Sequence, residues 1–70
     1  MRYFFRTEGG IPMEDDEGIP LVNDEAARTE ALHLFRTIIV HEPRETQARF
    51  RLFVMDEMGK EVAQVGIGQV

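Results

Sequence analysis

The chain contains no cysteine and no serine among its 70 residues. The lack of cysteine excludes disulfides and thiolate metal sites. The lack of serine leaves only threonine and tyrosine hydroxyls as oxygen nucleophiles, and none of them has a recognisable catalytic setting. A domain of this size buries only about 60 % of the surface of its unfolded chain, so we expect marginal stability. Self-association is one of the few remaining ways to add to it.

Long hydrophobic runs are missing as well. No segment approaches the about 20 apolar residues that cross a bilayer, and the N-terminus lacks the basic, apolar and small-residue succession of a secretion signal. We therefore expect a cytoplasmic protein that does not bind membranes. The formal net charge of −5 disfavours general affinity for nucleic acid, because such affinity depends on cations that neutralise phosphates.

The first 22 residues predict a strand, a turn and a second, shorter strand. Residues 2–7 alternate, with three side chains on one side (Tyr3, Phe5, Thr7) and three on the other (Arg2, Phe4, Arg6). Gly9 and Gly10 favour a turn. Two prolines allow at best a short or edge strand in residues 11–22, with an acidic bend at 15–18.

The strongest pattern in the sequence predicts a helix over residues 24–42. Asn23 is placed to cap it, and Pro43 is expected to end it. With 100° per residue, four positions form a stripe that should face the core, namely Ala27, Ala31, Leu34 and Ile38.

Residues 49–55 and 60–67 are predicted to form a hairpin around a four-residue loop. That loop would place Ala63 opposite Leu52 and Val65 opposite Phe50. The order is strand, short strand, helix, strand, strand. It predicts a single α+β domain over residues 1–70, in which one helix lies across one face of a small antiparallel sheet.

Five stretches together resemble a family of small proteobacterial proteins of unknown function. They are Arg2–Phe5, Gly9–Gly10, Asp15–Gly18, Glu25–Ala31 and Val54–Gly59, and the match runs from Arg2 to about Val65. The chain departs from the family at Arg6, where relatives often carry an acidic residue or histidine, and at Val22-Asn23, where they tend to have Pro-Asp. The resemblance implies the same fold and no known activity.

Three features carry weak chemical signals. Glu30 and His33 have the Glu-x-x-His spacing of metal-binding helix bundles, but one helix cannot supply the other ligands, so a solvated pair is expected. His41 is expected to interact with the helix C-terminus. Residues 13–18 are expected to be a solvated acidic turn, with weak cation binding as the alternative. We therefore predict no enzyme activity, no metal and no cofactor.

The second face of the sheet is the most informative feature. Phe4 and Phe53 should point away from the helix, among arginines. Together with apolar helix positions beside the stripe, the candidate interface is Arg2, Phe4, Arg6, Leu32, Phe35, Ile39, Arg49, Arg51, Phe53 and Met55. We expect this surface to bind a second copy or another protein. The alternatives are a surface that stacks single-stranded nucleic acid bases and an ordinary solvated face.

Overall fold

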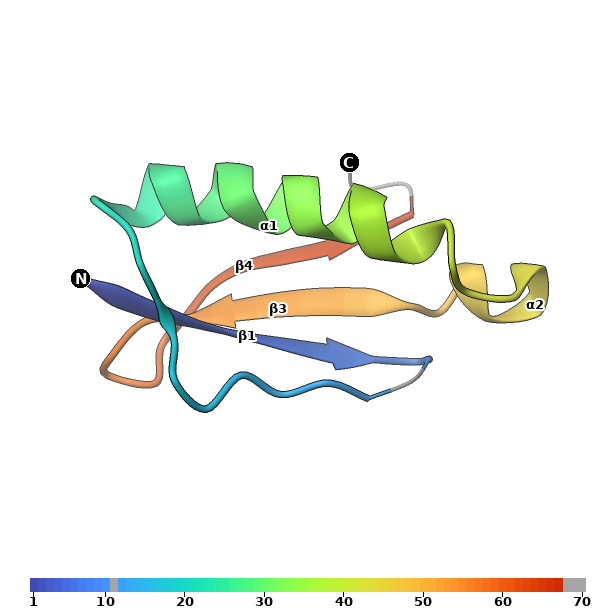
Figure 1. Cartoon of the computed structure of the whole chain (residues 1–70), viewed down its shortest axis with the longest axis horizontal. Coiled ribbons are helices and arrows are strands. Elements are labelled where there is room, and N and C mark those ends of the chain that lie inside the picture. Colours follow the sequence, from blue (N-terminus) through green and yellow to red (C-terminus); the bar gives the residue numbers. More distant parts are fainter. Residues whose placement is uncertain (11, 68–70) are drawn as a thin grey trace.

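The computed structural model describes residues 1–10 and 12–67, and these form one antiparallel sheet and two helices. The elements are β1 (Arg2–Glu8), β2 (Ile19–Pro20), α1 (Asp24–Ile39), α2 (Arg44–Gln47), β3 (Arg51–Met55) and β4 (Glu61–Gly66). The strand order is β2-β1-β3-β4, and α1 runs along one side of the sheet, nearest β4 (Figure 1). The predicted α+β architecture is therefore confirmed.

The alternation of β1 decides which of its side chains enter the core. Tyr3, Phe5 and Thr7 are buried on the face that meets α1, as predicted. The opposite face carries Arg2, Phe4 and Arg6. β2 is a two-residue edge strand with Ile19 opposite Tyr3, which confirms the short strand expected from the prolines.

The N-terminus of α1 follows the predicted cap. Asn23 is in an extended conformation and its Oδ1 accepts a hydrogen bond of 2.8 Å from the backbone N–H of Ala26. The carboxylates of Asp24 and Glu25 lie in the first turn, where the helix dipole favours negative charge.

The buried stripe of α1 is rotated from the predicted one. Its buried residues are Ala27, Ala31 and Phe35, whereas Leu34 and Ile38 are only half-buried. Phe35 stacks on Phe50, with ring centroids 5.6 Å apart and planes at 30°. The two small alanines let α1 approach the sheet closely, so the large ring that follows them at the same spacing fills the core.

The helix ends three residues before the predicted end. Residues 40–42 form a turn in which the N–H groups of His41 and Glu42 donate to the carbonyls of Ile38 and Ile39. The side-chain amide of Gln47, on α2, then donates to the carbonyls of Ile39 and Glu42 at 3.3 and 3.2 Å. Carbonyls at the end of α1 are thus satisfied by the side chain of Gln47, and the residues that follow the predicted stop at Pro43 form the short helix α2.

The hairpin has the predicted faces but a different register. Leu52 lies opposite Val65 and Val54 opposite Ala63, and the register shifts between Val54 and Met55. This irregularity, together with a loop that extends to Lys60, moves the pairing by two residues. An even shift leaves the same side chains facing the helix, so the core is unaffected.

Tyr3 joins the start of the sheet to the start of α1. Its side chain is fully buried, and its hydroxyl donates a hydrogen bond of 2.7 Å to Oδ1 of Asp24. This hydrogen bond, burial and the nearby negative charges raise the pKa of Tyr3 from 10.0 to about 12. The folded state therefore holds the phenolic proton more tightly than the unfolded chain does.

Alkaline pH should weaken the fold through this one residue. The stabilisation is complete below pH 10 and is lost as the pH rises through about 12, because only the protonated hydroxyl can donate to Asp24. Tyr3 is the only tyrosine, so an ultraviolet titration of tyrosinate reports on it alone. Tyr3→Phe should have lower stability at neutral pH and a shallower loss of stability between pH 10 and 12. A tyrosine that titrates at its ordinary pKa in the folded protein would contradict this prediction.

Candidate functional site

The outer face of the sheet, which is the face opposite α1, gathers most of the predicted interface residues. The pairing of β1 with β3 sets Phe4 opposite Met55 and Arg6 opposite Phe53. Arg2 and Arg51 lie on the same face, near its two ends. Three arginines and two phenylalanines therefore share one surface.

This outer face is partly covered by its own side chains. The guanidinium carbon of Arg6 lies 4.8 Å from the centroid of the Phe53 ring, and Phe53 is only 9 % exposed. Phe4 is half-buried, and a Cβ built on Gly18 would lie 2.9 Å from its ring. Phe4 and Phe53 thus point away from α1, as predicted, and cation–π packing and the 16–18 bend shield them.

Four other candidate interface residues lie away from the outer face. Phe35 is 2 % exposed in the core, so its assignment to an interface was wrong. Arg49 precedes β3, is exposed and donates to the carbonyl of Glu45 at 3.3 Å. Leu32 and Ile39 are half-buried on the flank of α1 that is turned away from β1.

The two edges of the sheet differ. On one side the edge consists of β2 and a single bridge between Arg6 and Glu14, interrupted by Pro12 and Pro20. On the other side lies β4, six residues long and without proline. No other strand within residues 1–10 and 12–67 pairs with the outer edge of β4. Sequence reasoning missed this edge, because strand order is not visible in a sequence.

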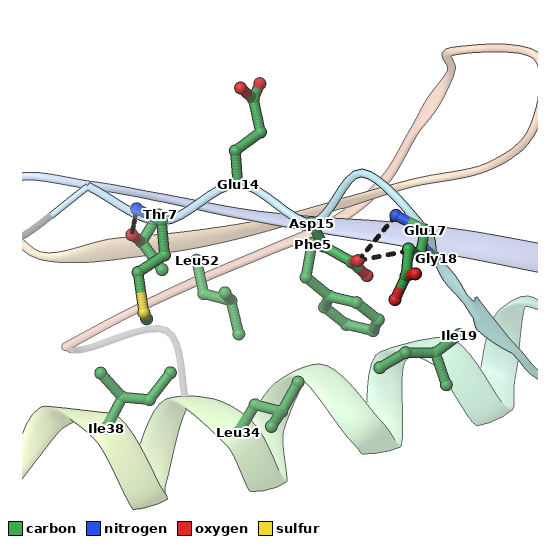
Figure 2. Close-up of a pocket in the computed structure, with 11 residues that line it drawn as sticks. Phe5, Thr7, Glu14, Asp15, Glu17, Gly18, Ile19, Leu34, Ile38 and Leu52 are labelled. Carbon is green, nitrogen blue, oxygen red and sulfur yellow. Dashed lines mark hydrogen bonds between the residues drawn. The ribbon is translucent and has the colours of Figure 1, made fainter.

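A groove of about 390 Å³ lies between β1, α1 and the segment 13–19. We call it the β1–α1 groove, and Figure 2 shows its lining. Its lining is largely made of apolar side chains, namely Phe5, Met13, Ile19, Leu34, Ile38 and Leu52. It exists because α1 packs against β3 and β4 and leaves the inner face of β1 incompletely covered.

Hydrogen bonds hold the wall of the β1–α1 groove in place. The N–H of Thr7 donates to the carbonyl of Met13 at 3.0 Å, and the Thr7 hydroxyl oxygen accepts from the N–H of Met13 at 2.9 Å. The N–H of Asp15 donates to the carbonyl of Phe5. Segment 13–15 is thereby fixed along β1.

The acidic bend uses one carboxylate for its own structure. Oδ1 of Asp15 accepts hydrogen bonds from the N–H groups of Glu17 and Gly18 at 3.1 and 3.0 Å. Gly18 has a φ of +80°, which completes the turn. Among the described residues no group of three or more histidine, aspartate or glutamate side chains could hold a metal ion.

A second hollow lies beside a buried carboxylate. Glu42 is buried against Gly10, and its Oε1 accepts a hydrogen bond of 3.2 Å from the Thr46 hydroxyl.

Glu30 and His33 lie on the outward half of α1, where Glu30 is half-buried and His33 exposed. His41 is exposed in the turn after α1, and the side chain that caps this end is Gln47. None of these side chains meets a second catalytic group.

Comparisons with known proteins identify a family but no activity. No helix in the part of the chain described by the structure is long and apolar enough to cross a membrane. Neither the curated proteins nor the solved structures gave a match to this chain. One family model, described as a domain of unknown function (DUF6894), matches residues 2–68. The chain therefore belongs to the DUF6894 family.

Proposed function

We propose that this protein is a non-enzymatic, cytoplasmic module that self-associates as a homodimer through the outer edge of β4. The observation that carries the proposal is the six-residue edge of β4, with which no strand of residues 1–10 and 12–67 pairs, whereas the opposite edge is interrupted by prolines. An uncovered edge strand is a template for another strand, since its outward N–H and C=O groups need partners.

The chemistry of β4 favours a second copy as its partner. Residues 62–66 carry no charged side chain, so two molecules of net charge −5 can meet here without opposing like charges. A two-fold axis perpendicular to the sheet pairs side chains that share a face. Gln64 would then lie opposite Gln64 of the second copy, or Ala63 would lie opposite Ala63 of the second copy.

The flank of α1 extends this edge with apolar surface. Leu34 and Ile38 line the β1–α1 groove. Successive residues of a helix are rotated by 100° about its axis, which places Leu32 and Ile39 on the opposite flank of α1 from Leu34 and Ile38. That opposite flank overhangs β4. Ile67, just beyond β4, is 52 % exposed. Docking of two copies would bury these side chains and add to a small core.

Leu32→Lys tests the proposal. The wild type should have a mass in solution twice that of one chain, and its melting temperature should rise with protein concentration. Leu32→Lys should weaken association by at least about tenfold, because it places a charge in the apolar flank. Val22→Lys makes the same charge change at an exposed residue away from β4 and is the matched control.

Amide hydrogen exchange identifies the surface. If β4 docks on its copy, N–H groups on its outer edge should be protected in the wild type and exchange faster in Leu32→Lys. A concentration-independent monomer would refute the proposal. A dimer that dissociates in Phe53→Glu, with an unprotected β4 edge, would assign the interface to the outer face of the sheet instead.

Single-stranded nucleic acid is the second candidate partner, and the outer face is where it would bind. The arginines of this face favour it, because Arg2, Arg6 and Arg51 would meet the phosphates. Phe4 would supply the stacking surface. This alternative predicts RNA binding that falls steeply with salt and is lost in Phe4→Ala.

A further inference from the structure

The β1–α1 groove combines an apolar interior with a rim of one charge sign. Phe5 and Leu52 are buried at its floor, and Leu34 and Ile38 form the α1 wall. The charged residues that line it are all acidic, namely Glu14, Asp15 and Glu17. Asp15 and Glu17 lie at the end of the groove next to Phe5 and Ile19, whereas Glu14 points away from α1 (Figure 2).

The size and walls of the groove favour a small molecule over a peptide. A volume of about 390 Å³ falls within the range of about 300–1,000 Å³ that is typical of small-molecule pockets. An added strand is disfavoured, because segment 13–15 is already paired with β1 and Pro12 and Pro20 interrupt this edge.

We propose that the β1–α1 groove binds a small amphiphilic cation, a molecule with an aliphatic chain and a protonated amine. The chain would lie between Phe5, Leu34 and Ile38, and would replace water on the half-buried side chains of Leu34 and Ile38. The amine would lie at the end of the groove beside the carboxylate of Glu17. The proposal is independent of self-association, since the groove and the β4 edge are on opposite flanks of α1.

Charge complementarity decides the sign of the ligand. Among the described residues no arginine or lysine lines the groove, and the guanidinium of Arg2 donates to the carbonyls of Glu17 and Gly18 from the outer face, at 2.9 and 3.3 Å. Glu14 points away from α1 and Oδ1 of Asp15 is engaged by the bend, so the carboxylate of Glu17 sets the charge at this end of the groove. An anion of the same length would be repelled by this carboxylate, and a neutral molecule would gain nothing from it.

Octylammonium, octanoate and 1-octanol test the proposal in one titration series. The three probes share a chain length and differ in charge, and they are added below any concentration at which they aggregate. Binding is followed by amide chemical shifts of the isotopically labelled protein. Octylammonium should shift the amides of Phe5, Leu34 and Ile38 and bind at least about threefold tighter than octanoate.

Two variants separate the charge from the groove. Glu17→Gln should weaken octylammonium by about two- to fivefold and leave octanol unchanged. Glu25→Gln, which makes the same charge change on the far flank of α1, should have no effect. Ile38→Phe keeps a hydrophobic side chain but fills the groove, so it should abolish the shifts produced by all three probes while the protein remains folded.

Three results would overturn the proposal. Equal affinity for octylammonium and octanoate would remove the assigned charge. Shifts spread over the whole surface, and unchanged in Ile38→Phe, would show adsorption outside the groove. Shifts of Leu34 and Ile38 that follow protein concentration instead of added probe would assign the groove to a second copy of the chain.

Discussion

Phe50→Ala should remove roughly half of the free energy of unfolding. Phe50 is fully buried and stacks on Phe35, so its truncation removes apolar contact and leaves a cavity between α1 and β3. Such changes cost about 3–5 kcal/mol. A chain of 70 residues has a total stability of only about 4–10 kcal/mol. The melting temperature, measured at one fixed protein concentration, should fall by more than about 12 °C.

Phe4→Ala is the matched control for this prediction. It makes the same chemical change on the outer face, where Phe4 is half-buried. Its cost should be clearly smaller, because less surface is returned to water and no closed cavity forms. If the two variants lost equal stability, the assignment of the core to the α1 side of the sheet would be wrong.

Gly9→Ala should have the second largest effect. Gly9 has a φ of +86°, and a Cβ at this position would overlap the backbone carbonyl of Arg49. The left-handed backbone costs about 1–2 kcal/mol for a residue with a side chain. The overlap costs about a further 1–3 kcal/mol, because the turn after β1 must move away from the start of β3.

Gly59→Ala separates these two costs. Gly59 has a similar φ of +82°, but no atom lies within 4 Å of an added Cβ. Only the conformational cost of about 1–2 kcal/mol should remain. Urea unfolding of both variants measures the difference. Equal destabilisation would show that close packing between Gly9 and Arg49 contributes nothing.

The sequence was sufficient where a single residue or a short period determines the structure. Asn23 caps α1 because its side chain alone satisfies a free N–H at that position. The alternation of Tyr3, Phe5 and Thr7 reports the two faces of a strand directly. Pro20 restricts β2 to two residues. Each of these depends on local chemistry, so no knowledge of the tertiary structure was required.

The predictions from the sequence were wrong where contacts between separate segments determine the structure. The end of α1 at Ile39 depends on the amide of Gln47, eight residues further along the chain. The hairpin pairing depends on an irregularity at Val54 and Met55, which no turn motif announces. The inward direction of Phe35 depends on how closely Ala27 and Ala31 bring α1 to the sheet. The periodicity of the sequence shows which side of α1 is apolar, and packing against the sheet determines which of those residues are buried.

The candidate sites were less predictable than the fold. The sequence showed which side chains share the outer face, but the cover that Arg6 provides for Phe53 is a matter of side-chain conformation. The β1–α1 groove arises from the lateral position of α1 over β3 and β4. The open edge of β4 arises from strand order. Neither position nor order follows from residue spacing.

The inequality of the two sheet edges limits how large an assembly can grow. A sheet with two open edges can add a further strand at each edge repeatedly, which is how sheets extend into fibres. In the described part of this chain one side is interrupted by prolines and only β4 remains open. Each molecule can therefore pair with one further strand, through β4. If two molecules pair through β4, as proposed, that pairing would occupy the one remaining open edge, so association through it would stop at two copies.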